Sequence, residues 1–239
     1  MSLLTVVRHG QASFFADDYD KLSDLGIKQA QRLGEYWADR QTEFDEVYAG
    51  PRFRQQHTAE HAGAVCRQRG LRWPEPIILP ALDEYDLSGL TTHLVPKLAE
   101  LDHEFAQLVE THRKSQGERD RLREFQRMFE SLLRRWQLND IEGLEVESWL
   151  AFQQRVQHVV KQIQDSPGRS RKVAVFTSGG FIGTAVQFAL GTSADKALEL
   201  NWRIRNCSIT EFVFTADRFT LDSFNSIPHL TDPELWTHR

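Results

Sequence analysis

The sequence has few of the features that mark disulfide-stabilised, membrane-spanning or nucleic-acid-binding proteins. Only two of its 239 residues are cysteines, Cys66 and Cys207, which form no CxxC pair and are expected to pack as small apolar side chains in a reducing compartment. No apolar run is long enough to cross a bilayer, and we expect no leader because a strand begins within the first residues. The formal net charge of −5 provides no basic field for nucleic acid or an anionic membrane. These absences favour a cytoplasmic protein that attracts a small anionic partner locally, through clustered arginines.

Motifs for metal ions and for nucleotides are missing as well. The sequence contains no HExxH, no Cys/His ligand spacing, no aspartate cluster suited to magnesium and no Walker-type glycine-rich loop. We therefore expect a site that works without a metal ion or another cofactor.

The sequence does show the alternation of segments that is typical of an α/β protein. Hydrophobic residues make up 40% of the chain and charged residues 26%, which is ordinary for a globular protein. Strand-like and helix-like segments alternate, which predicts a doubly wound, mostly parallel sheet flanked by helices. We expect one domain over residues 1–239. The predicted strands are 3–7, 44–49, 77–82 and 172–176, with a closing hairpin of 210–214 and 219–224, and the predicted helices are 22–40, 54–69, 148–164 and 181–190.

The alternation of strand-like and helix-like segments stops in the middle of the chain. From about residue 94 to 138 the sequence is highly charged and helical, and Gly117 separates two amphipathic helices. We therefore expect a helical insertion at about residues 91–140. An apolar stripe that includes Phe129 and Trp136 is explained by core packing with a solvated charged face. The insertion would in addition suit a lid that shapes substrate choice.

The first strand runs directly into Arg8-His9-Gly10-Gln11. Ligands of doubly wound sheets collect at the carboxyl ends of strands. Gly10 permits a sharp turn close to a ligand, and the planar guanidinium of Arg8 suits phosphate oxygens. This pattern predicts an anion site, although a loop histidine beside a surface arginine would have the same sequence.

Other polar residues follow the remaining predicted strands. Arg52 and Arg54 come after the second strand, Glu84 follows the third, and Ser178 precedes a glycine pair where a helix begins. Free N–H groups and the positive end of the helix dipole favour anions there. Arginines, one histidine, one carboxylate and a helix N-terminus at one rim suit metal-free phosphoryl transfer to the histidine.

Five motifs in the same order resemble the histidine phosphatase superfamily, which has the phosphoglycerate-mutase-like fold. The resemblance covers both ends of the chain and leaves the helical insertion weakly matched. The motifs are Arg8-His9-Gly10-Gln11, Leu22–Gly26 with Gln29-Ala30, Gly50–Arg54 with Thr58-Ala59, Leu82-Asp83-Glu84, and the C-terminal Asn206–Ile209 with Asn225 and His229-Leu230.

The resemblance implies a role for each matched residue. His9 would become phosphorylated, Arg8 and Arg54 would clamp the phosphate, and Glu84 would be the general acid and base. Asp83 and Asp86 lie beside Glu84 and are the alternatives to it. The residues expected to contact the phosphate in addition are Gln11, Ser178 and Gly179.

Two positions depart from the family pattern. Ser178 stands where the family normally has a second histidine that donates to the phosphoryl group. A serine hydroxyl donates one neutral hydrogen bond, and charge-assisted bonds are roughly twice as strong, so activity would be reduced. Ser178 also suits a simple N-cap, and His93 is a candidate replacement for the missing histidine. Phe15 stands where mutase members usually carry an asparagine.

Three functions are consistent with these residues. The first is a phosphomonoesterase that acts on a small phosphorylated substrate through phosphohistidine at His9. The second is a phosphoglycerate mutase, which Phe15 and Ser178 disfavour. The third is a phosphate-binding or scaffolding protein that has lost turnover, which Ser178 motivates. Phe14, Phe15 and Tyr85 near the rim suggest a partly apolar leaving group.

Overall fold

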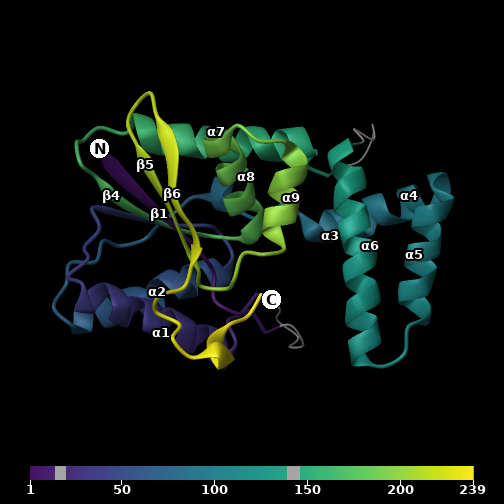
Figure 1. The fold of residues 1–239 in the computed structure, drawn as a ribbon, viewed down its shortest axis with the longest axis horizontal. Coiled ribbons are helices and arrows are strands. Elements are labelled where there is room, and N and C mark those ends of the chain that lie inside the picture. Colours follow the sequence, from purple (N-terminus) through teal and green to yellow (C-terminus); the bar gives the residue numbers. More distant parts are fainter. Residues whose placement is uncertain (14–19, 139–145, 239) are drawn as a thin grey trace. The chain divides into compact units, whose positions relative to one another are not determined.

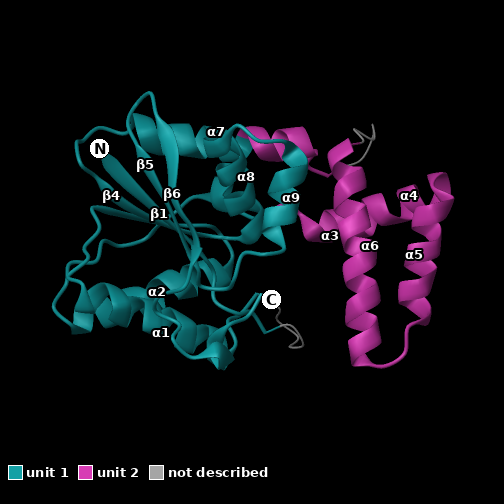
Figure 2. Ribbon diagram, viewed as in Figure 1, with its two compact units in different colours: residues 1–84, 155–239 teal, residues 85–154 magenta. Residues whose placement is uncertain are grey.

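The computed structural model describes residues 1–13, 20–138 and 146–238. Over these residues the chain divides into two compact units, residues 1–84 with 155–239 and residues 85–154 (Figure 2). No helix of the described residues is long and apolar enough to cross a membrane.

The first unit is built on a six-stranded sheet, in the part of the chain that the structure describes. Its strand order is β3-β2-β4-β1-β5-β6. The first four strands in this order pair in parallel, β5 runs antiparallel to β1, and β6 runs antiparallel to β5. The prediction of a mostly parallel sheet with a closing hairpin is therefore confirmed. The strands are β1 (Ser2–Arg8), β2 (Glu46–Ala49), β3 (Ile77–Ile78), β4 (Lys172–Thr177), β5 (Ile209–Phe214) and β6 (Phe219–Ser226).

Helices cover both faces of this sheet (Figure 1). Helices α1 (Asp24–Asp39) and α2 (Phe53–Gln68) lie on one face, and α7 (Trp149–Asp165), α8 (Gly179–Leu190) and α9 (Ala194–Asn201) lie on the other. A buried aromatic cluster fills the space beneath α1 and α2. The ring centroid of Trp37 lies 4.9 Å from that of Phe44 and 5.7 Å from that of Trp73, and Trp73 lies 6.2 Å from Phe176 of β4. These contacts hold α1 against the centre of the sheet.

The predicted strand over residues 77–82 is wrong beyond Ile78. The chain forms a 3-10 turn, η1 (Pro80–Leu82), with Pro80 as its first residue. Proline has a fixed φ and no N–H to donate to a neighbouring strand, so it ends the pairing. Helix α9 lies in a stretch for which the sequence pattern gave no element.

The second unit is helical, as predicted, but its helices begin earlier than residue 91. Its elements are α3 (Leu87–Gly89), the π-helical turn η2 (Leu90–Leu94), α4 (Val95–Leu101), α5 (His103–Lys114), α6 (Glu118–Leu138) and the first turns of α7. Gly117 separates α5 from α6, with a φ of +79°.

The apolar stripe of α6 forms the core of this second unit. Trp136 is buried, and its ring centroid lies 5.2 Å from that of Trp149 and 5.4 Å from that of Tyr85. Tyr85 also packs against Phe152 at 5.8 Å. The core interpretation of the stripe is therefore confirmed. The suggestion that Tyr85 contacts a leaving group is wrong, because its ring is buried in this core. The corresponding suggestion for Phe14 and Phe15 falls outside the described residues.

The loop after β1 is pressed against the first turn of α1. Ser23 caps this helix as predicted, because its hydroxyl accepts a hydrogen bond from the Gly26 N–H at 3.1 Å. A Cβ placed at Gly26 would overlap the carbonyl oxygen of Gln11, and a Cβ at Gly10 would lie 2.6 Å from the carbonyl oxygen of Gly26. Two glycines therefore allow the backbones to touch beside His9.

We expect Gly26→Ala to destabilise the protein by about 1–3 kcal/mol, because the added methyl group meets backbone rather than a flexible side chain. The free energy of unfolding from urea titration measures this. The control is Gln31→Ala on the exposed face of the same helix, which should change stability by less than about 0.5 kcal/mol. Equal effects of the two substitutions would contradict the argument.

Candidate functional site

Strand β1 places His9 at the centre of the sheet. The strand lies between β4 and β5, and the backbone just beyond its end is held from both sides. His9 N–H donates to the Thr177 carbonyl at 2.9 Å, and the His9 carbonyl accepts from Cys207 N–H at 3.1 Å and from Asn206 Nδ2 at 3.2 Å. The position of the imidazole is thus fixed by main-chain bonds to two neighbouring segments.

The hydrogen bonds of the His9 ring assign its tautomer. Nδ1 lies 2.7 Å from the Gly10 carbonyl oxygen, and Arg54 Nε lies 3.2 Å from Nε2. A carbonyl accepts and a guanidinium donates, so the proton is on Nδ1 and the lone pair is on Nε2. Burial, followed by the positive charges of Arg54 and Arg8, lowers the pKa of His9 well below its usual value. The arrangement leaves a neutral imidazole with a nucleophilic nitrogen facing a cation.

Arg54 is held in place by an acid that the sequence analysis missed. Arg54 lies in the first turn of α2, and its Nη1 makes an ion pair with Asp20 Oδ1 at 2.7 Å. The second oxygen of Asp20 accepts from the Phe53 N–H at 2.8 Å. Several acids follow the first strand, and nothing in their spacing distinguishes Asp20 from the others.

Arg8 adjoins His9 in the sequence, and its Nη1 binds main-chain carbonyls in the C-terminal part of the chain. Its Nη1 donates to the Ile204 carbonyl and, at 2.9 Å, to the His238 carbonyl. Its charge still acts on the imidazole, because it contributes to the lowered pKa of His9. The guanidinium is therefore oriented by residues that lie 196 and 230 positions away in the sequence.

Glu84 reaches the N-terminus of α8. Its Oε2 accepts from the Gly180 N–H at 3.0 Å. The two neighbouring acids have other partners: Asp83 pairs with Arg52 at 2.7 Å, and Asp86 accepts from the Gly89 N–H at 3.0 Å. Among these three acids, Glu84 is the one that the structure brings to the glycine pair after β4.

Ser178 occupies the N-cap position of α8, but its hydroxyl does not cap the helix. Instead, Gln55 Nε2 donates to Ser178 Oγ at 2.8 Å, and the Gln55 Oε1 accepts from Arg52 N–H at 3.1 Å. Both side chains are buried. Because the serine oxygen accepts from Gln55, its own proton is available to a further acceptor. Sequence reasoning missed Gln55, although its position next to Arg54 in the first turn of α2 was a usable signal.

The other two predicted phosphate contacts have structural partners. Gln11 Oε1 accepts from the Ser23 hydroxyl at 2.9 Å, and the Gln11 N–H donates to Gln29 Oε1 at 2.9 Å. A Cβ at Gly179 would overlap Asn201 Oδ1 of α9, so close packing already requires a glycine there. His93 belongs to the second unit, and its compensation for Ser178 remains a prediction.

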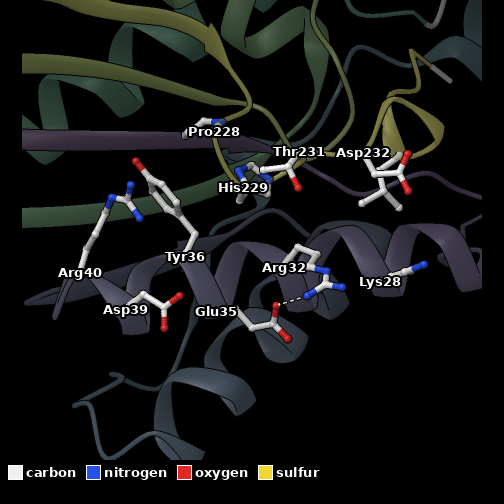
Figure 3. A pocket seen from close by; sticks show the side chains of 11 residues that line it. Lys28, Arg32, Glu35, Tyr36, Asp39, Arg40, Pro228, His229, Thr231 and Asp232 are labelled. Atoms are coloured by element: carbon white, nitrogen blue, oxygen red, sulfur yellow. Dashed lines mark hydrogen bonds and ion pairs between the residues drawn. The ribbon is translucent and has the colours of Figure 1, made fainter.

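A pocket elsewhere in the first unit contains none of these residues. It has a volume of about 330 Å³ and lies between α1 and the segment 228–235 (Figure 3). Tyr36 and Arg40 line the side formed by α1, with the Arg40 guanidinium 3.8 Å above the Tyr36 ring, and the buried His229 lines the other side from the segment 228–235. Burial lowers the pKa of His229 to about 4.

Within the described residues, no cluster of three or more His, Cys, Asp or Glu side chains is arranged to hold a metal ion.

Solved structures with a similar fold include two phosphatases and a mutase. Phosphoglycerate mutase from Bacillus anthracis is 17% identical, with a TM-score of 0.62 over 96% of this chain and 95% of its own. Phosphoserine phosphatase from Entamoeba histolytica, in complex with 3-phosphoglyceric acid, is 17% identical, with a TM-score of 0.61 over 96% and 100%. Alpha-ribazole phosphatase from Shigella flexneri is 19% identical, with a TM-score of 0.58 over 94% and 96%. These likenesses establish the fold.

The sequence comparisons address the family directly. No curated protein matches the chain significantly. The model of the histidine phosphatase superfamily, branch 1, matches residues 4–137 and 118–227. These ranges include His9, Arg54, Glu84 and Ser178. The chain belongs to the histidine phosphatase superfamily.

Proposed function

We propose that this protein is a metal-free phosphomonoesterase that forms a phosphohistidine on His9. The observation that carries the proposal is the lone pair of His9 Nε2, which is held unprotonated in a buried site beside Arg54. Membership of a superfamily with phosphatase and mutase relatives supports phosphoryl transfer in general. The Entamoeba and Shigella relatives, both named phosphatases, support hydrolysis as the outcome.

The reaction has two steps. His9 Nε2 attacks the phosphorus, an N–P bond forms, and the P–O bond to the alcohol breaks while Glu84 gives its proton to the departing oxygen. Glu84 then accepts a proton from water, which attacks the phosphohistidine and releases inorganic phosphate and free His9. A general acid must reach the leaving oxygen, and the bond between Glu84 and Gly180 N–H keeps its carboxyl group at the end of β4.

The positive groups stabilise the transferring phosphoryl oxygens. Arg54 and Arg8 supply charge, and the Gly179 N–H at the N-terminus of α8 supplies a main-chain donor. Gln11, whose side chain binds the N-cap residue Ser23 of α1, is a further polar group at the phosphate. The hydroxyl of Ser178 donates the bond that a second histidine supplies in other members. Gln55 fixes the orientation of this hydroxyl, because it occupies one acceptor site of the serine oxygen.

Two alternatives remain open to experiment. The Bacillus anthracis relative is a mutase, but Phe15 replaces the asparagine that mutases usually carry. The loss of a charged donor at Ser178 motivates a scaffolding protein that binds phosphate without turnover. Both alternatives predict little release of inorganic phosphate from a phosphate ester.

His9→Ala should abolish both turnover and covalent labelling by a ³²P-labelled phosphate ester, because no other group carries the phosphoryl. The wild-type label should be acid-labile, as expected of a phosphohistidine. His158→Ala, an exposed histidine of α7, serves as the control and should keep both properties. With 3-phosphoglycerate as substrate, release of inorganic phosphate supports the phosphatase, whereas formation of 2-phosphoglycerate supports the mutase. Turnover by His9→Ala would disprove the assignment of the nucleophile.

The ring of His9 should stay neutral as the pH falls through 6.5, the usual pKa of histidine. Because the pKa of His9 is lowered, kcat/KM should not fall through protonation of His9 between pH 7 and pH 6. A ¹⁵N NMR titration should report an unprotonated Nε2 over this range. Arg54→Gln removes one positive charge and should raise the His9 pKa toward its usual value. A His9 ring that titrates near pH 6.5 in the wild type would contradict the geometry.

Ser178→Ala should lower kcat about 10²-fold, the lower end of the cost of losing an oxyanion-type donor. Gln55→Met should lower kcat about tenfold, since it keeps the volume but removes the bond that orients the hydroxyl. The double variant should be no slower than Ser178→Ala, because Gln55 acts through Ser178. Additive effects would refute this coupling.

Gln56→Met is the matched control on the same helix. Its amide donates to the Pro51 carbonyl at 2.7 Å and not to Ser178, so kcat should change by less than about twofold. Ser178→Ala also separates enzyme from scaffold, together with Ser178→His. A barely active wild type that gains strongly from Ser178→His supports a scaffold, and a wild-type rate well above that of His9→Ala excludes it.

A further inference from the structure

A second group of cations lies beside Arg8, outside the set that acts on the phosphoryl group. It consists of Arg203 and Arg205, and His238 lies beside them. Arg8 connects the two groups, because its Nη1 donates to the carbonyls of Ile204 and His238. The Arg8 side chain thus links this group to the candidate active site.

Main-chain bonds fix the two segments that carry these cations. Asn206 N–H donates to the Thr237 carbonyl at 2.9 Å, and the Thr237 hydroxyl donates to Asn206 Oδ1 at 2.9 Å. Asn206 also donates from Nδ2 to the His9 carbonyl at 3.2 Å. The residue before Asn206 is therefore tied to the nucleophile through a rigid framework.

Arg203 and Arg205 form no ion pair among the described residues. In the described ranges, no carboxylate pairs with either guanidinium, whereas Arg52 and Arg54 pair with Asp83 and Asp20. The Nε of Arg205 is buried and has no hydrogen-bond acceptor. A buried donor without an acceptor is unfavourable, so the position favours a ligand that supplies an acceptor.

The electrostatics of His238 report the same cluster. Burial lowers the pKa of His238, and the charges of Arg205, Arg8 and Arg203 lower it further. Arg8 also lowers the pKa of His9. The charge of Arg8 therefore acts on both histidines, His9 and His238.

Arg205 is also preorganised. Its guanidinium carbon lies 5.6 Å from the ring centroid of Trp236, and its backbone N–H donates to Asn225 Oδ1 at 2.8 Å. A planar fork of donors held against an indole loses less entropy on binding than a free side chain does. A solvated surface arginine would not have its Nε buried without an acceptor.

We propose that Arg205, with Arg203 beside it, binds a second anionic group of the substrate, so that the protein prefers phosphomonoesters that also carry a carboxylate or a further phosphate. This inference rests on the proposed function, since it assumes that the phosphoryl group is bound at His9. It assigns selectivity to the segment before β5 and to the C-terminal segment of the first unit.

The test uses a matched pair of substrates, phenyl phosphate and 4-carboxyphenyl phosphate. Arg205→Gln should lower the ratio of kcat/KM for the carboxylated ester to that for the plain ester about tenfold, because one charge-assisted bond is lost. Arg205→Lys should lose less, since it keeps the charge. Taking the ratio within each variant cancels the difference between the leaving groups. Arg218→Gln, an exposed arginine at the far end of β6, should leave the ratio within about twofold of the wild type.

Binding to His9→Ala separates the two proposals. Calorimetric titration of His9→Ala with the same two esters should show tighter binding of the carboxylated ester, and Arg205→Gln in this background should remove the difference. An unchanged ratio in both assays would overturn the second anion site while leaving the phosphatase standing. Failure of both esters to bind or turn over would overturn the proposed function. Thermal melting shows whether Arg205→Gln remains folded, and Arg203→Gln provides the second variant.

Discussion

The contact between Arg54 and His9 sets the condition on which the rest of the site depends. A guanidinium can only donate, so its hydrogen bond to Nε2 requires that nitrogen to be unprotonated. Burial and two nearby positive charges make the protonated ring unfavourable, and the Gly10 carbonyl takes the remaining N–H. The ion pair with Asp20 holds the guanidinium of Arg54 beside the ring. A buried cation that stabilises a neutral base is also a cation positioned for an incoming anion.

The strand order explains why the participants meet. Strand β4 lies between β1 and β2, so the residue after β4 lies between the residues that follow its neighbours. Ser178 accordingly reaches Gln55, which adjoins Arg54, while the Thr177 carbonyl accepts from the His9 N–H. The Thr177 hydroxyl donates to the Leu82 carbonyl at 2.6 Å, which brings in the segment that carries Glu84. Strand β4 and the residue after it thus connect the segments that carry His9, Gln55 and Glu84.

The sequence predicted the parts of this arrangement that follow from strand ends and motif order. His9, Arg54, Glu84 and Ser178 each follow a strand, and parallel strands end at the same edge. Asp20 was not predicted, because a partner that lies across a loop leaves no periodic trace, and Gln55 was missed although it adjoins Arg54 in α2. The orientation of Arg8 could not be foreseen either, since its acceptors are main-chain carbonyls, which every residue possesses. The prediction of a strand over 77–82 was wrong because it followed the apolar residues around Pro80 and not the proline itself, which ends strand pairing.

By its resemblance to the family, Ser178 stands in place of a histidine, and this difference would change the titration of the site as well as its strength. A second imidazole would add a group that gains charge near neutral pH, and its charge would lower the pKa of His9 further. A serine hydroxyl oriented by a glutamine amide does not titrate, so the number of donors facing the transferring group stays constant across that range. The weaker neutral bond is offset only if permanent charges lie close by, and Arg8 and Arg54 are such charges. An uncharged donor at this position is therefore compatible with an active site in which arginines, rather than imidazolium, supply the positive field.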